Sequence, residues 1–253
     1  MTGKKGWISS MQDKRLIELH SHLLPQMDDG SDSVEMSLAM LNCEAEQNVG
    51  TVCVTPHYYA DQNSIATFCE RRSAALEKLL AALPEGLPRI IPAAEVAFFS
   101  GISECEGLGK LCIENTRTLL LEMPFGVWND FQVEEVSALV LDRGYEVVLV
   151  HPERFCTSRG NRRKLNQLTE LPVGMQVNAG TLLHWRNRRL GLELLQQARI
   201  PLLASDCHNL DLRRPNLKEG RAVVARWLGE AFLEEIDRNA EQLTSIFEVH
   251  ISG

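Results

Sequence analysis

The amino-acid sequence predicts an α/β protein whose parallel strands form an incomplete or distorted barrel. Seven short runs rich in Val, Ile and Leu recur along the chain, and segments with helical periodicity separate them. A polar side chain of the catalytic or metal-binding type follows or interrupts each run. Strands that alternate with helices predict parallel βα units joined by right-handed crossovers.

The predicted strands are apolar on consecutive residues, which is typical of strands buried on both faces. They are RLIEL before His20, GTVCVTP before His57, RIIPAAEV around Glu95, TLLLEMPF around Glu122, YEVVLVHPER around His151, GMQVNAG around Asn178, and IPLLASDCHN around Asp206 and His208.

The segments between these runs have the periodicity of helices. They cover residues 34–48, 64–83, 131–143, 161–170, 187–199 and 217–247, the last as two helices. A Ser/Asp-rich capping stretch precedes the first helix, and the sequence PEGLP ends the second. No low-complexity linker or repeat divides the chain, so we expect a tail at residues 1–15 and a single domain at residues 16–253.

Two arrangements of parallel βα units agree with this pattern, an open doubly wound sheet and a closed barrel. In an open sheet the polar residues would be spread along one edge, whereas in a barrel they would converge on one mouth. Because all seven predicted strands end in such residues, the barrel is favoured. Seven strands instead of eight predict that it is incomplete or distorted.

Composition limits the functional class. The 253 residues carry a formal net charge of −8, which argues against a nucleic-acid partner held by bulk electrostatics. The seven scattered cysteines are typical of a reducing cytosol. The N-terminus has no apolar signal-peptide core, and the apolar runs are too short to cross a bilayer. We therefore expect a cytoplasmic protein without membrane insertion, and a homo-oligomer is compatible with the sequence.

Side chains at the ends of the predicted strands form a candidate metal-binding set. Residues i and i+2 of a strand point to the same side, so His20 and His22 can aim at one point, as can Asp206 and His208. Any one of these residues could be an ordinary hydrogen-bonded side chain, but five of the seven histidines lie at predicted strand ends. The full set is His20, His22, Asp29, His57, Glu95, Glu122, His151, Asp206 and His208.

Nine ligands exceed the needs of one ion and suit two or three ions with bridging carboxylates. Imidazoles and carboxylates without a thiolate cluster favour Mn²⁺, Fe or Zn²⁺ over Mg²⁺ or Ca²⁺.

Other residues near these ligands are expected to have different roles. Cys207 is expected to point away from its neighbours as a packing residue. Asp28 is expected to shape the turn before Gly30. Arg154, with Arg213 or Arg214, would bind phosphate oxygens at the rim, so the pattern favours displacement at phosphorus.

Several motifs together resemble a known superfamily. HSHLLPQMDDG, VTPHYY, AAEV, LLEMPF, HPERF and SDCHNLDLRRP, in this order, resemble the PHP (polymerase and histidinol phosphatase) superfamily over about residues 17–220. Many metallohydrolases share HxH alone. HSHxLPxxDDG is more specific and resembles the CpsB/CapC-type tyrosine phosphatases of capsule biosynthesis.

This resemblance implies a distorted (β/α)7 TIM-like barrel, the PHP fold, with three metal ions, usually manganese. It places the ligands on all nine residues named above and the phosphate-binding arginines at Arg154 and Arg213. The implied substrate is phosphotyrosine on the tail of a bacterial tyrosine kinase of capsule or exopolysaccharide biosynthesis. The chain departs from the family in its N-terminal extension and in RRP, where many members have one arginine before two prolines.

The expected reaction is in-line attack on phosphorus by a metal-bridging hydroxide, with the arginines on the non-bridging oxygens. One alternative is a PHP-type phosphatase or phosphodiesterase acting on small-molecule phosphates or nucleotides. Another is a non-catalytic metal-binding scaffold, against which the full ligand set and the arginines argue.

Two C-x5-R matches, Cys156–Arg162 and Cys207–Arg213, are formally those of cysteine phosphatases. A cysteine nucleophile needs backbone N–H groups at a helix start, usually in a glycine-bearing loop. The second match has no glycine and the first has a single late one. We therefore predict that neither thiol is a nucleophile.

Overall fold

The computed structural model describes residues 15–156 and 158–245. Apart from Arg15, the predicted tail at residues 1–15 lies outside these ranges. The strands are β1 (Leu16–Ser21), β2 (Val49–Val54), β3 (His57–Tyr58), β4 (Arg89–Pro92), β5 (Glu95–Ala97), β6 (Thr118–Glu122), β7 (Glu146–Val150), β8 (Gly174–Asn178) and β9 (Ile200–Ala204). The helices are α1 (Val34–Glu46), α2 (Ile65–Ala82), α3 (Asp130–Leu141), α4 (Arg159–Thr169), α5 (Ala179–Leu183), α6 (Trp185–Gln197), α7 (Leu217–Leu228) and α8 (Glu230–Thr244), with 3₁₀ turns η1 (Ile102–Glu104), η2 (Leu108–Leu111) and η3 (Pro152–Arg154).

The strands form two parallel sheets. One has the order β1-β2-β4 and the other has the order β3-β5-β6-β7-β8-β9. The chain passes from β2 into β3 and from β4 into β5, and the Ala93 N–H donates to the Val54 carbonyl where the sheets meet. A parallel bridge between Ser21 and Cys207 joins the end of β1 to the segment after β9. The two sheets therefore belong to one α/β domain.

The predicted elements are confirmed. Each of the seven apolar runs contains a strand, although the run at 89–96 is divided into β4 and β5. Helices occur in every predicted segment, and the segment from residue 217 holds two, α7 and α8. Ser33 and Ser64 cap α1 and α2 through their hydroxyls, and Asn129 forms a capping box with Gln132 at α3. The short helix α5 was not predicted.

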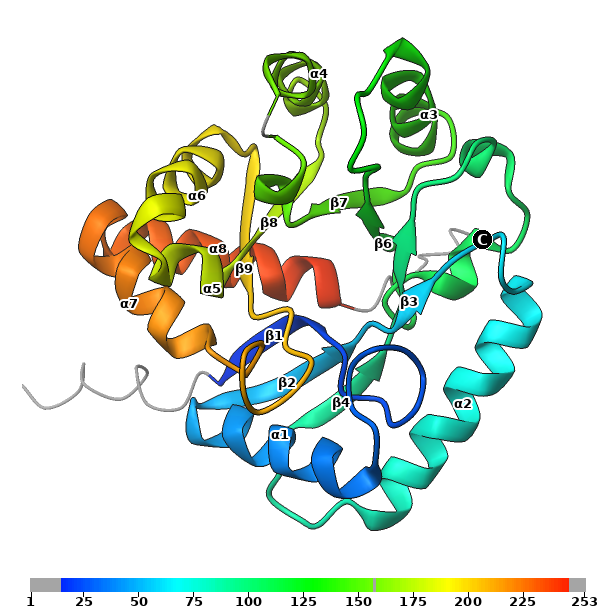
Figure 1. The fold of residues 1–253 in the computed structure, drawn as a ribbon, viewed down its shortest axis with the longest axis vertical. Coiled ribbons are helices and arrows are strands. Elements are labelled where there is room, and N and C mark those ends of the chain that lie inside the picture. Colours follow the sequence, from blue (N-terminus) through cyan, green and yellow to red (C-terminus); the bar gives the residue numbers. More distant parts are fainter. Residues whose placement is uncertain (1–14, 157, 246–253) are drawn as a thin grey trace, which may run out of the picture.

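The apolar core has two parts, and strand alternation decides which residues enter each. Leu119 and Leu121 of β6 pack with the helices in the larger cluster, whereas Leu120 lies in the smaller one. The smaller cluster draws residues from both sheets and also from α8, through Ala240 and Leu243. Figure 1 shows the helices placed around the strands. No helix among the described residues is both long and apolar enough to cross a membrane.

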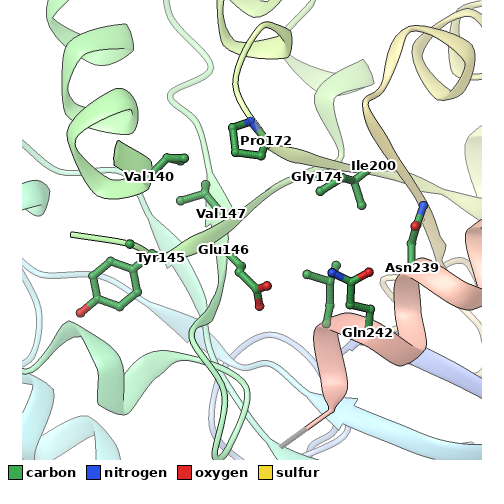
Figure 2. A pocket seen from close by; sticks show the side chains of 11 residues that line it. Val140, Tyr145, Glu146, Val147, Pro172, Gly174, Ile200, Asn239 and Gln242 are labelled. Carbon is green, nitrogen blue, oxygen red and sulfur yellow. The ribbon is translucent and has the colours of Figure 1, made fainter. Parts of the chain in front are cut away.

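One cavity lies at the starts of the strands. It has a volume of about 280 Å³ and is lined by Val147 of β7, Gly174 of β8 and Ile200 of β9, together with Asn239 and Gln242 of α8 (Figure 2). These residues occupy the amino-terminal ends of their strands. The cavity is therefore separate from the polar cluster, which gathers at the carboxyl-terminal ends.

Candidate metal centre

Two histidines at the end of β1 form the middle of the polar cluster. The Nε2 atoms of His20 and His22 lie 3.2 Å apart, and each lies 3.2 Å from Oε2 of Glu95. Asp206 Oδ1 is 3.5 Å from both nitrogens. All four side chains are buried. Segments far apart in the sequence thus bring two imidazoles and two carboxylates to one point.

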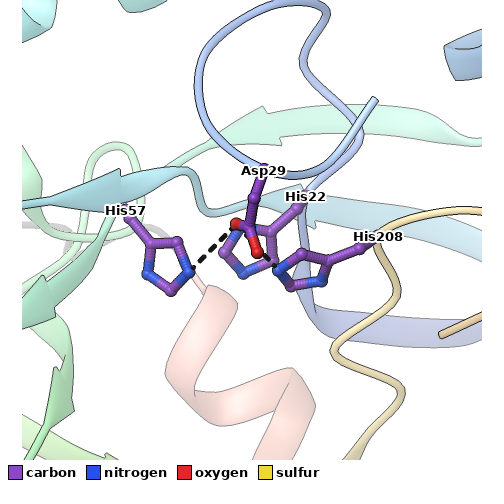
Figure 3. Close-up of side chains that lie close together, drawn as sticks. All are labelled: His22, Asp29, His57 and His208. Carbon is purple, nitrogen blue, oxygen red and sulfur yellow. Dashed lines mark ion pairs between the residues drawn. The ribbon is translucent and has the colours of Figure 1, made fainter. Parts of the chain in front are cut away.

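The nine predicted ligands all lie in this cluster. Eight of them form three overlapping groups, and within each group the donor atoms lie within 4.8 Å of one another. His151 joins them because its Nε2 is 2.7 Å from Glu95 Oε1. Figure 3 shows Asp29 between the rings of His57 and His208, with His22 behind. The groups are His22, Asp29, His57 and His208; His20, His22, Glu95 and Asp206; and His57, Glu95 and Glu122.

Backbone geometry turns two of these side chains toward the others. His151 and Asp206 have positive φ angles of 36° and 53°. Residues other than glycine seldom adopt this region, which costs on the order of 1 kcal/mol. β9 ends at Ala204, so strand alternation does not place Asp206 and His208, although they do meet as predicted. Instead, the Asp206 N–H donates to the His20 carbonyl and holds the segment beside β1.

Asp28 orients the ring of His22. The His22 Nδ1–H donates to Asp28 Oδ2 at 2.6 Å, and the His57 backbone N–H donates to the same oxygen at 2.9 Å. Asp28 also accepts from the Gly30 N–H at 3.0 Å, which confirms its expected part in the turn. A Cβ atom on Gly30 would lie 2.2 Å from the His22 carbonyl oxygen, so the turn requires glycine. The DDG sequence therefore aims Nε2 of His22 into the cluster.

Three side chains support the cluster, of which Gln176 and Glu18 were missed from the sequence and Asn178 was named there without a role. Gln176 Oε1 accepts from His20 Nδ1 at 2.9 Å, and Asn178 Nδ2 donates to Asp206 Oδ2 at 2.8 Å. Glu18 is buried and accepts from the backbone N–H groups of His20 and Ser205. Glu18 precedes His20 by two residues, and Gln176 precedes Asn178 by two. This alternation was a signal that could have identified them.

Carboxylates control the charge of the cluster. Burial alone would lower the pKa of His22, but its hydrogen bonds with Asp28 and Glu95 outweigh this effect and raise it to about 10. Burial raises the pKa of Glu122 to about 7, and the neighbouring charge of Glu95 adds to the shift. Burial and the charge of His22 lower the pKa of His208 to about 3. The buried carboxylates therefore favour a positive charge within the cluster. Protons and metal cations would compete for the same ring nitrogens and carboxylate oxygens.

The donor set fits divalent cations. Among the described residues, the buried ring nitrogens His57 Nδ1 and His208 Nε2 have no hydrogen-bond partner. His57 Nδ1 nevertheless lies 2.9 Å from Glu95 Oε2, and His208 Nε2 lies 3.4 Å from Asp29 Oδ1. Ring nitrogens and carboxylate oxygens that lie close together without a hydrogen bond between them are suited to binding one cation. The role of the nine residues as ligands stays a prediction.

Two of the three predicted arginines reach the cluster. Arg213 Nη2 donates to both oxygens of Asp206 at 2.9 Å, and Arg154 Nη2 donates to Asp206 Oδ2. Each of these side chains is 33% exposed, so it faces solvent as well as the carboxylate. Arg214 is more exposed and pairs with Glu219 at 3.0 Å. Of the two arginines between which the sequence does not decide, Arg213 therefore reaches the cluster and Arg214 does not.

The cysteines of the two C-x5-R matches are buried. Burial raises the pKa of Cys156 to about 12 and that of Cys207 well above its ordinary range. The Cys207 thiol points away from the cluster and donates to Glu44 Oε1 at 3.6 Å. Neither side chain has the depressed pKa of a thiolate nucleophile.

Both the sequence and the fold are similar to those of known proteins. The family model for capsular polysaccharide synthesis, CpsB/CapC, matches residues 16–245. The chain is 28% identical over 237 residues to the tyrosine-protein phosphatase YwqE of Bacillus subtilis, covering 90% of this chain and 91% of the relative. It is 24% identical over 238 residues to the tyrosine-protein phosphatase CpsB of Streptococcus pneumoniae, covering 87% and 94%.

The fold has a close counterpart among solved structures. A chain from the crystal structures of YwqE from B. subtilis and CpsB from S. pneumoniae, described as unique metal-dependent tyrosine phosphatases, superposes with a TM-score of 0.79. The match covers 92% of this chain and 96% of that chain at 24% identity. The two proteins therefore share a mixed α/β fold with parallel sheets.

Proposed function

The chain belongs to the CpsB/CapC family of capsular polysaccharide synthesis proteins, and on this premise we propose that it is a metal-dependent protein-tyrosine phosphatase. The observation that carries the proposal is the meeting of nine imidazole and carboxylate side chains with two arginines at Asp206. Such a site combines cation binding with recognition of a phosphoryl group. The relatives named above are tyrosine-protein phosphatases.

We interpret the two sheets as one distorted (β/α)7 barrel. The β2–β3 and β4–β5 segments each count as one barrel strand because the chain continues through them. The bridge between Ser21 and Cys207 supports closure, as does the small apolar cluster shared by both sheets. In such a barrel the carboxyl-terminal ends of the strands surround the active site.

We propose that the cluster holds three divalent ions, with manganese as first candidate and iron or zinc as alternatives. The three overlapping groups of ligand atoms support this number, with His151 added beside Glu95. When bound, the ions would supply Lewis-acid chemistry, which activates the attacking water and neutralises charge on the phosphoryl oxygens.

The chain's own residues bind and orient the substrate. Arg154 and Arg213 are placed to donate to non-bridging phosphoryl oxygens, because a guanidinium binds them in pairs. Asp28 and Gln176 hold the rings of His22 and His20 by their Nδ1 atoms, which leaves both Nε2 atoms directed at Glu95. The leaving phenol has a pKa of about 10, so it needs less protonation than an alkoxide.

The proposed substrate is phosphotyrosine on the tail of a cognate bacterial tyrosine kinase of capsule or exopolysaccharide biosynthesis. The family assignment supports a role in this process. We place the protein in the cytoplasm, because all seven cysteines are free thiols and such thiols persist in reducing compartments.

Metal analysis and phosphatase assays of the wild type and a His20→Ala/His22→Ala variant test the proposal. The wild type should hydrolyse a phosphotyrosyl peptide with manganese, lose activity in EDTA and tolerate iodoacetamide. The double variant should keep its fold by circular dichroism and lose bound metal and activity. Full activity in the variant, or iodoacetamide sensitivity together with EDTA resistance, would contradict the metal mechanism.

A substrate panel separates the proposal from its alternatives. Faster turnover of histidinol phosphate or nucleotides than of phosphotyrosyl peptide would favour a small-molecule phosphatase. No hydrolysis of any phosphoester with manganese bound would favour a non-catalytic scaffold.

A further inference from the structure

A groove between α6 and α7 combines exposed tryptophans with arginines. Trp185 of α6 and Trp227 of α7 are 75% and 57% exposed, whereas Trp128 is 3% exposed. Both exposed indoles line a groove of about 450 Å³, together with Leu192 and Leu228. Exposed tryptophans that share one hollow are uncommon on a surface that contacts only water.

The helix that forms one wall carries a local excess of positive charge. Helix α6 contains three arginines and one acid, although the whole chain has a net charge of −8. Trp185, Arg188, Arg189 and Leu192 have the i, i+3, i+4, i+7 spacing of a single helix face, and all four line the groove. The apolar surface and the cations therefore belong to the same site.

The arginines differ in how firmly they are held. Arg188 donates to the carbonyl oxygens of Leu182 and Leu183, which fixes its guanidinium beside the groove. Arg189 is 90% exposed at its side chain and pairs with Glu193 at 2.7 Å. An ion pair this exposed is screened by solvent and is weak, so Arg189 can exchange Glu193 for another carboxylate at little cost.

We propose that this groove docks an acidic polypeptide segment that carries an aromatic or leucine-type side chain. Carboxylates of the segment pair with Arg189 and Arg188, and its apolar side chain lies between Trp185 and Trp227. Tryptophan and arginine are the residue types that contribute most at protein interfaces. The site is separate from the metal cluster and would help recruit the protein substrate under the proposed function.

Charge argues against the chain's own ends as occupants. Residues 1–14 carry three lysines and one acid, so they do not complement the arginines. Residues 246–253 carry a single acid, too few to pair with both Arg188 and Arg189.

Fluorescence anisotropy with a labelled random copolymer of glutamate and tyrosine tests the docking. The wild type should bind it about tenfold or more tightly than a copolymer of lysine and tyrosine, and Arg189→Glu should weaken binding about tenfold. Arg238→Glu is the matched control, because Arg238 is also exposed and pairs with a glutamate four residues away, Glu234 on α8. It should bind like the wild type. Trp227→Ala should also weaken binding, as a test of the apolar half.

Equal binding by wild type and Arg189→Glu would overturn the proposal. A dimer in light scattering that Arg189→Glu dissociates would also overturn it, because the occupant would then be a second copy of this chain. Neither measurement depends on phosphatase activity.

Hydrolysis assays keep the two proposals distinguishable. Turnover of para-nitrophenyl phosphate should be the same in the wild type and both groove variants, whereas KM for the phosphorylated copolymer should rise with kcat unchanged. A wild type that binds the copolymer but hydrolyses neither substrate would refute the phosphatase function and leave the docking site standing.

Discussion

Substitution of Asp28 by asparagine tests whether the DDG turn orients the cluster. Asp28 Oδ2 accepts from the His22 ring and the His57 backbone, while Oδ1 accepts from Gly30. Asparagine has one carbonyl oxygen, so its amide must face either the first two donors or the third. In both orientations the charge-assisted bond to His22 loses its anion.

The structure sets the expected size of this effect. The Asp28 side chain is only 7% exposed, so solvent screens its interactions little. The loss of a hydrogen bond to a charged group costs about 1.5 to 3 kcal/mol of unfolding free energy. Loss of a residue that orients a metal-binding histidine also weakens metal affinity by about 10- to 100-fold. Burial would raise the pKa of Asp28, but His22 outweighs it and lowers that pKa, so the carboxylate's contribution is fully present at neutral pH.

Two measurements at neutral pH check the prediction. Urea unfolding of metal-free protein gives the change in stability, and competition with a chromophoric chelator gives the change in manganese affinity. Asp32→Asn is the matched control, since Asp32 lies in the same loop and is exposed. If the Asp28 variant matched this control in both measurements, the orienting role would be refuted.

Three further predictions follow from single contacts. Arg213→Ala should raise KM for phosphotyrosyl peptide about tenfold or more in steady-state kinetics. Arg214→Ala should change KM less than about twofold, because Arg214 pairs with Glu219 and does not reach the cluster. Burial raises the pKa of Glu44 well above its ordinary value, so this group should make the wild type lose stability as pH rises from below about 4.5 toward the raised pKa. The slope in urea unfolding should therefore be smaller in Glu44→Gln than in the wild type. Gly30→Ala should cost about 1 to 3 kcal/mol of unfolding free energy, because the new Cβ meets the His22 carbonyl oxygen.

Each of these predictions has a result that contradicts it. Equal KM values for the two arginine variants would remove the distinction between Arg213 and Arg214. A pH slope as large in Glu44→Gln as in the wild type would show that Glu44 does not contribute to it. Gly126→Ala is the control for Gly30→Ala, since a Cβ there meets nothing within 4 Å, and equal stability of both variants would refute the steric argument.

Local patterns were enough to predict most elements of this fold. Apolar runs bounded by turns marked all seven strand regions, because strands buried on both faces have few polar residues. The division between β4 and β5 at Ala93–Ala94 could not be predicted. β4 pairs with β2, whereas β5 pairs with β6, so the division lies where the segment changes its partner strand. Such pairing involves residues that are distant in sequence.

The candidate ligands were predictable from residue type and position, but the reasons were only partly correct. His20 lies on β1 as expected, whereas Asp206 lies beyond β9 and reaches the cluster through a left-handed backbone. Gln176 and Glu18 were missed because a single amide or acid within an apolar run looks like an isolated exception to the apolar pattern of the strand. Only the fold reveals that each contacts a predicted ligand or its backbone.

The bridge between Ser21 and Cys207 has a consequence for folding order. The contact beside it, from the Ser205 N–H to Glu18, joins residues 187 positions apart in the chain. Closing so long a loop gives the region a high contact order, and such contacts form slowly. During synthesis, His20 and His22 therefore leave the ribosome long before Asp206 and His208 exist. The complete cluster can assemble only when both ends of the domain have been made. A cation would therefore bind the full set of ligands only after the whole domain has been synthesised.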